Sequence, residues 1–153
     1  MNDKSHGGLV RLCMGLLLAG AIASAAPTAW AQDEYKSLGA TLFGENEIGH
    51  EGAGDDAGGD FDGEIDMEQG TLCYYLEVYG LDEVTASHLY KGGKGVNGEP
   101  VLALEVLGED GDEVCAQVEP ELLRDIMRNE FNYYVNVHTA ALPAGAIRGQ
   151  LGS

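Results

Sequence analysis

Two histidines, His88 and His138, are the residues of this chain best suited to carry chemistry. Both stand in alternating segments that predict β-strands, and imidazoles that converge from neighbouring strands can bind Zn²⁺ or Cu²⁺. A catalytic zinc or copper centre usually takes three protein ligands, and His50 is the only other imidazole after residue 31. Two hypotheses therefore stay open: a Cu or Zn site that uses His88 and His138, and a structural hydrogen-bond cluster without metal.

Polar residues close to the C-terminus favour the structural hypothesis. Residues 131–139 and 146–151 alternate between apolar and polar side chains on either side of a Pro/Gly turn, which predicts a β-hairpin. Any register that joins the apolar faces of these strands also gathers four polar side chains, Asn136, His138, Arg148 and Gln150. Because arginine offers five donors and asparagine supplies a carbonyl acceptor, we expect Arg148 and Asn136 to pair and to hold the last strand in register.

The N-terminus predicts export. Residues 1–31 combine positive charge at Lys4 and Arg11, an apolar run over 12–26, and a small-x-small cleavage site at 29–31, as in a secretory signal peptide. We therefore expect a secreted or periplasmic protein whose mature part, 32–153, is one domain and has no membrane segment. With 25 acidic and six basic side chains, the mature part has a net charge of −19, which excludes nucleic acid and anionic lipid as partners. No oligomeric state follows from the sequence.

Two cysteines, Cys73 and Cys115, remain in the mature part. An even number of cysteines in an exported chain predicts a disulfide bond between them. In the chain-entropy model this bond would stabilise the fold by roughly 4 kcal/mol. A catalytic thiol and a metal-binding pair are the alternatives.

Five carboxylates close together could bind Ca²⁺ weakly through their oxygens: Asp55, Asp56, Asp60, Asp62 and Glu64. The spacing is not that of an EF-hand, because Ile65 and Thr71 occupy the sixth and twelfth positions counted from Asp60. The alternative is a solvated acidic loop, extending from residue 44 to 63, that binds no cation specifically.

No motif predicts an enzyme. The stretch 92–95 lacks the spacing of a P-loop, and no serine stands in a G-x-S-x-G motif. We expect no catalytic residue and no resident cofactor.

The elements that position these residues are mostly strands. Alternating patterns predict strands at 36–43, 61–68, 71–79, 85–91, 100–107 and 114–118 besides the terminal hairpin, and one helix at 120–129. The tyrosines on the polar side of 71–79, Tyr75 and Tyr79, could form a contact surface or be covered by a second sheet. Many short strands with frequent turns are typical of an all-β sandwich or barrel.

Two stretches resemble the CHRD (chordin) domain family: 134–139 with 147–151, and 86–92 with 95–101. The resemblance runs from about Ser37 to Leu151 and adds His88 to the motif's polar residues. It implies an antiparallel Greek-key β-sandwich, immunoglobulin-like or superoxide-dismutase-like, and no general enzymatic activity. Since chordin binds growth factors outside the cell, it also implies an extracellular protein partner. Tyr90 stands where the family has a second histidine, which counts against a dismutase-like metal centre.

Overall fold

The computed structural model describes residues 34–106 and 111–152; the predicted signal peptide lies outside them. The strands of the described part are β1 (Tyr35–Phe43), β2 (Gly58–Asp66), β3 (Thr71–Tyr79), β4 (Val84–Lys91), β5 (Glu99–Leu104), β6 (Val114–Gln117), β7 (Tyr133–Thr139) and β8 (Ile147–Gln150). Its helices are α1 (Pro120–Asn129) and two short 3-10 helices, η1 (Gly44–Asn46) and η2 (Glu130–Asn132). Among these residues no helix is long and apolar enough to span a membrane.

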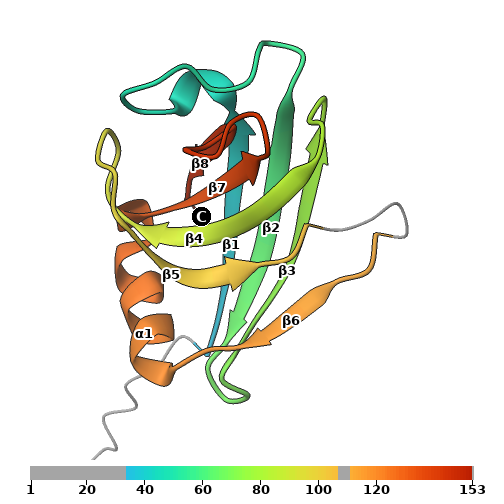
Figure 1. Cartoon of the computed structure of the whole chain (residues 1–153). Helices are drawn as coiled ribbons and strands as arrows, with labels where there is room; N and C mark the ends of the chain where they lie inside the picture. Colours follow the sequence, from blue (N-terminus) through green and yellow to red (C-terminus); the bar gives the residue numbers. More distant parts are fainter. Residues whose placement is uncertain (1–33, 107–110, 153) are drawn as a thin grey trace, which may run out of the picture. The chain divides into compact units, whose positions relative to one another are not determined.

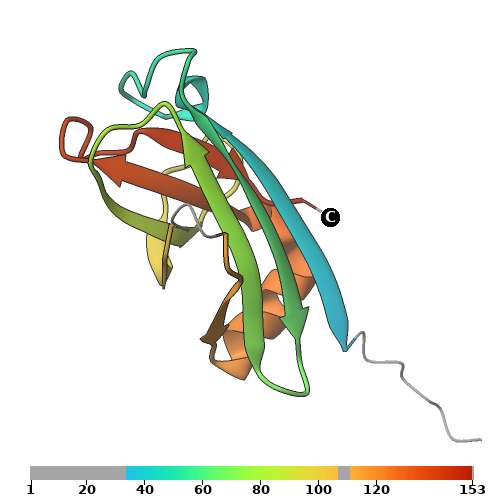
Figure 2. The same cartoon turned by 90° about the vertical axis from the view of Figure 1, so that its right-hand side faces the viewer.

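The strands form one antiparallel sheet in the order β5-β4-β7-β8-β1-β2-β3-β6. The sheet curls, so that its β4–β7 half and its β1–β3 half run in different directions across a shared interior (Figures 1 and 2). The junction between the halves is narrow: β1 pairs with β8 at Phe43 and Arg148, and Gly39 bridges to Gly152. The prediction of an all-β antiparallel fold with one short helix is confirmed.

The interior is filled by alternate side chains of both halves, as the two-residue period of a strand requires. Phe61 of β2 and Tyr74 of β3 stack with ring centroids 5.6 Å apart, and both are buried. The other large buried side chains include Leu42, Ile65, Leu72, Leu76, Leu89, Ile147 and Leu151. The outward positions of β2 carry carboxylates instead, so this half has an apolar inner face and an acidic outer face.

The prediction that residues 44–63 form one acidic loop is wrong at its C-terminal end. β2 begins at Gly58 and pairs along its whole length with β1 on one side and β3 on the other. Ladder hydrogen bonds on both edges hold this segment extended, despite its Gly and Asp content, because tertiary pairing overrides local propensity.

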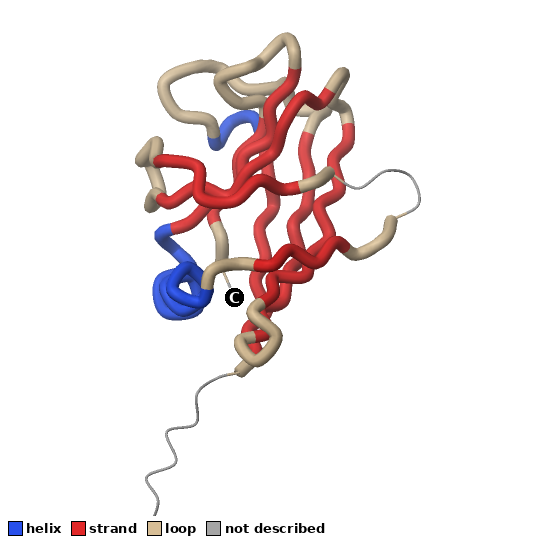
Figure 3. The backbone as a smooth tube through the Cα atoms, turned by 60° about the horizontal axis from the view of Figure 1, so that its bottom comes forward, coloured by secondary structure: helices blue, strands red, loops and turns tan. Residues whose placement is uncertain are grey.

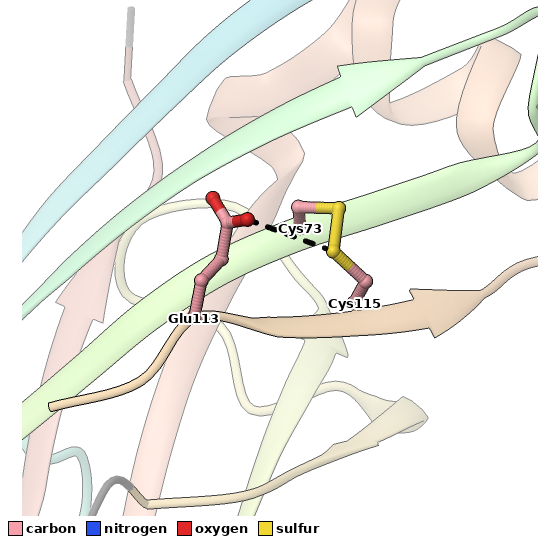
Figure 4. A group of neighbouring side chains, drawn as sticks. All are labelled: Cys73, Glu113 and Cys115. Atoms are coloured by element: carbon pink, nitrogen blue, oxygen red, sulfur yellow. Dashed lines mark hydrogen bonds between the residues drawn. A yellow bond between two sulfur atoms is a disulfide. The ribbon is translucent and has the colours of Figure 1, made fainter. Parts of the chain in front are cut away.

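The disulfide bond joins β3 to the edge strand β6. Cys73 and Cys115 are directly opposite residues of the two strands, with Cα atoms 3.9 Å apart. The Glu113 carboxylate lies 3.8 Å from the Cys115 sulfur (Figure 4), but a bridged sulfur has no proton to donate, so we treat this as a contact. The bond fixes a strand of four residues that has only one neighbour in the sheet.

Helix α1 lies across one end of the sheet, next to the ends of β4 and β7 (Figure 3). Its bounds match the prediction, since Pro120 suits the first turn and Leu123 and Ile126 face the core. Asp125 attaches the helix to both strands: it accepts hydrogen bonds from Lys91 at 2.6 Å and from the Tyr133 hydroxyl at 2.5 Å.

These bonds lead to a prediction about stability in acid. Hydrogen bonds from Lys91, Tyr133 and Asn129 lower the pKa of Asp125 to about 2, from 3.8. A carboxyl whose pKa falls on folding stabilises the fold above its unfolded pKa, and this contribution disappears as the pH falls from about 4 to about 2. Asp125→Asn should therefore lower the melting temperature at pH 7 and flatten its decline between pH 4 and pH 2, measured by circular dichroism.

The control is Glu121→Gln, which removes an exposed carboxylate from the same helix and should leave the acid-side slope unchanged. An Asp125→Asn slope identical to that of the wild type would contradict the assignment.

Candidate functional site

The outer face of β4, β7 and β8 collects every polar residue that the terminal motif predicted. His88 lies opposite Asn136, and Asn136 lies opposite Arg148. His138 and Gln150 occupy the same face two residues further along their strands. We call these five residues the polar cluster: His88, Asn136, His138, Arg148 and Gln150.

Arg148 is the most buried charge in the polar cluster, with 2% of its surface exposed. Its guanidinium lies 3.4 Å from the ring centroid of Tyr134, which stacks in turn on Tyr90 with centroids 5.0 Å apart. It donates to the Asn97 side-chain carbonyl at 3.0 Å and to the Val96 backbone carbonyl at 2.8 Å. The guanidinium therefore binds the loop at 92–98.

The expected pair between Arg148 and Asn136 is wrong. The Asn136 amide group donates to the Glu47 carboxylate at 3.3 Å instead. Gln150 has a role like that of Arg148, because its amide nitrogen lies 2.6 Å from the Tyr133 carbonyl and 3.0 Å from the Gly92 carbonyl. The polar cluster thus fastens loops onto the hairpin, and the two hairpin strands are held in register by their own ladder.

His138 has both ring nitrogens occupied. Its Nδ1 lies 3.2 Å from the Pro143 carbonyl, which can only accept, so Nδ1 carries the proton. Its Nε2 then accepts from the Tyr90 hydroxyl at 3.0 Å. Burial lowers the pKa of His138, which keeps the ring neutral near pH 7. A metal ion could reach either nitrogen only by breaking one of these bonds.

The described residues place no third metal ligand beside the histidine pair. The rings of His88 and His138 meet edge to face with centroids 5.8 Å apart. Within the described ranges, the only three His, Cys, Asp or Glu side chains whose donor atoms gather closely are Cys73, Glu113 and Cys115. Two of these, Cys73 and Cys115, are joined in the disulfide bond, so neither sulfur is a free thiolate that could bind a metal.

Glu47 belongs to this site, although the sequence did not predict it. It lies in the segment between η1 and β2, and its side chain is 2% exposed over the polar cluster. His50 Nε2 lies 3.5 Å from this carboxylate, and burial raises the pKa of Glu47. Its Oε1, together with Asn136 Oδ1 and His88 Nδ1, is buried without a hydrogen-bond partner from the described residues, a state that costs about 1–3 kcal/mol per group.

The candidate Ca²⁺ ligands divide between two elements. Asp55 and Asp56 lie in the turn before β2. The other three, Asp60, Asp62 and Glu64, alternate along the outer face of β2, where residues two apart are roughly 6.6 Å from each other. They line a strand and do not surround one point.

Arg148→Ala should lower the free energy of unfolding by about 1–3 kcal/mol, because the Asn97 and Val96 carbonyls lose their buried donor. Arg148→Lys should restore little of this loss, since an ammonium cannot reproduce the planar fork that stacks on Tyr134. Urea unfolding measures both effects.

The matched control is Arg124→Ala, which removes an exposed arginine from α1 and should change stability by less than about 0.5 kcal/mol. Equal losses at positions 124 and 148 would show that Arg148 has no special role.

Calorimetric titration with Cu²⁺ and Zn²⁺ separates the two hypotheses for the histidines. If His138 is a structural residue, His138→Ala should lower the melting temperature and should not change the heat of metal addition. Tight binding of one equivalent that is lost in both His88→Ala and His138→Ala would establish the metal site and overturn this assignment.

Three other residues of this site escaped prediction. Tyr90 and Tyr134 share the outward positions of β4 and β7, so strand parity could have placed them beside His88 and Asn136. Asn97 was noticed only as part of an Asn-Gly turn. Nothing in the sequence distinguishes it as a partner of Arg148, because that contact joins residues 51 positions apart.

Comparison with known proteins identifies the domain type. The family model described as CHRD domain matches residues 38–151, a span that contains all five residues of the polar cluster and both cysteines. No curated protein and no solved structure matches the chain.

Proposed function

Because the chain belongs to the CHRD domain family, we propose that it is an exported, non-catalytic domain that binds a basic protein in the periplasm or outside the cell. We also propose that its curled antiparallel sheet has the topology of a Greek-key sandwich. The contacts of the polar cluster support a non-catalytic role, because its polar groups are already engaged within the protein. Arg148 and Gln150 donate hydrogen bonds to backbone carbonyls, and both ring nitrogens of His138 are hydrogen-bonded.

The proposal rests on one observation, the uncovered outer face of β1, β2 and β3. Its tyrosines Tyr35, Tyr75 and Tyr79 are 53%, 42% and 51% exposed. Between them stand the carboxylates of Asp60, Asp62, Glu64 and Glu77. We call these seven residues the acidic tyrosine face. The other half of the sheet does not cover this face. Of the two alternatives for Tyr75 and Tyr79, a contact surface or coverage by a second sheet, their exposure favours the contact surface.

The charges of this face lack partners within the described residues. Asp60 and Glu77 are directly opposite each other on neighbouring strands, an arrangement of like charges that destabilises a sheet. The salt bridges of the described part involve other residues. Nearby carboxylates, Asp66 foremost, raise the pKa of Tyr35, as expected where the potential is negative.

A basic polypeptide fits this surface. Lysine and arginine side chains would relieve the repulsion between Asp60 and Glu77 and could also lie over the exposed tyrosine rings, a contact worth about 0.5–1 kcal/mol at an exposed site. Tyrosine is favoured at interfaces because its ring is apolar and its hydroxyl is polar. Association should weaken as salt is added, since exposed charges are screened.

Site-specific photo-crosslinking tests the proposal in the cells that make the protein. A photoreactive phenylalanine analogue at position 75 should give an adduct with a basic protein, and the same analogue at Val96, exposed in the loop at 92–98, should not. Asp60→Asn combined with Asp62→Asn should reduce the adduct several-fold. No adduct from position 75, or equal adducts from both positions, would refute the proposal.

A further inference from the structure

The curled sheet leaves two strands without a second neighbour. β5 and β6 stand at the two ends of the strand order, and each pairs with one strand only. Each therefore has one edge that pairs with no strand of the described sheet, which is a template for another strand, although Pro100 of β5 supplies no N–H. Figure 1 shows the two strands on the same open side of the sheet.

A groove of 560 Å³ borders both strands. Val101 and Leu102 of β5 and Gln117 of β6 line it, together with the turn at 67–70 and residues of the segment 118–122. Val101 is the extra residue of a β-bulge, because Leu89 pairs with Leu102 and Tyr90 with Pro100. Beyond the bulge, residues 102–104 pair regularly with β4, so their other edge is free next to the groove.

The groove is apolar inside and acidic at its rim. Val101 and Leu102 line the groove and stay only partly buried, although Leu89, the strand partner of Leu102, is completely buried. The core is therefore incompletely covered along this seam. The rim carries Glu68 and Glu119, and no basic side chain lines the groove.

Three contacts hold parts of the groove lining in place. Tyr74 of β3 accepts a hydrogen bond from the Glu105 backbone at 2.8 Å, which joins the end of β5 to the opposite half. On the side of β3 and β6, the Val118 backbone donates to the Gly70 carbonyl at 3.0 Å. The Cys73–Cys115 bond holds β6 on β3 between these points. A preformed groove lowers the cost of binding.

We propose that this groove binds an extended segment of a partner polypeptide, which adds to the free edge of β5 as a further strand. Its apolar side chains would cover Val101 and Leu102, and lysines or arginines at the alternate positions would face Glu68 and Glu119. This is β-strand addition, in which backbone hydrogen bonds give affinity and side-chain pockets give specificity.

The charge of the chain decides between this occupant and a second copy of the protein. A net charge of −18 over the full sequence makes two copies repel each other, and the groove rim has the same sign. The groove shares no residue with the acidic tyrosine face, so the inference stands independently of the proposed function.

A short peptide of alternating lysine and valine, blocked at both ends, is the probe. It should bind the exported protein with one-to-one stoichiometry in a calorimetric titration. Its copy with N-methyl groups on alternate backbone nitrogens has the same charge but cannot donate to the β5 edge. That copy should bind at least about tenfold more weakly.

Two variants with equal charge locate the binding. Leu102→Arg puts a like charge inside the groove and should weaken the lysine–valine peptide at least about tenfold. Ala103→Arg adds the same charge to the exposed neighbour outside the groove and should change affinity less than about twofold. Circular dichroism confirms that each variant is folded.

Hydrogen exchange gives a second readout that requires no mutation. Saturating peptide should slow exchange at backbone amides of residues 101–104 and leave those of β1 unchanged. Equal affinity for the methylated and unmethylated peptides, equal loss in both variants, or no binding while the protein dimerises through this edge would each overturn the proposal.

Discussion

One residue, Arg148, joins the two halves of the sheet, η1 and the loop at 92–98. Its backbone pairs with Asn136 on one side and with Phe43 on the other, so it stands at the narrow junction between the two halves of the sheet. Its carbonyl accepts a hydrogen bond from Asn46 of η1 at 2.9 Å. Its guanidinium binds the loop at 92–98 and lies over Tyr134. The guanidinium therefore positions the loop at 92–98, and the backbone carbonyl of the same residue positions η1.

A buried guanidinium is stable here because its charge is satisfied by fixed groups. Two backbone carbonyls and one amide carbonyl accept its donors, and the ring of Tyr134 supplies its negative face. Hydrogen bonds to charged groups contribute more than neutral ones, about 1.5–3 kcal/mol each. Burial of the Glu47 carboxylate is less favourable than burial of the Arg148 guanidinium, because one Glu47 oxygen has no hydrogen-bond partner among the described residues. Burial accordingly raises the pKa of Glu47.

Local patterns in the sequence were sufficient to predict the helix, most of the strands and their faces, but not the start of β2 at Gly58. The helix at Pro120–Asn129, the terminal hairpin and the outward positions of the polar cluster all follow from periods of 3.6 and 2 residues. The partners across the fold could not be predicted this way. Whether Arg148 meets Asn136 or Asn97 depends on how a loop 51 residues away closes, and periodicity contains no information about loop closure. Glu47 was hidden among many solvated carboxylates of identical type.

The pairing of β1 with β8 has a consequence for the order of folding: β1, the first strand, gains its second neighbour only when β8, the last strand, is present. During synthesis, residues 35–79 can pair as β1, β2 and β3 long before residues 147–150 exist. Until then β1 keeps one edge open, and an open edge can recruit a strand from another chain. Pairing of the last strand closes this edge of β1 and removes the template that an open edge offers to another chain.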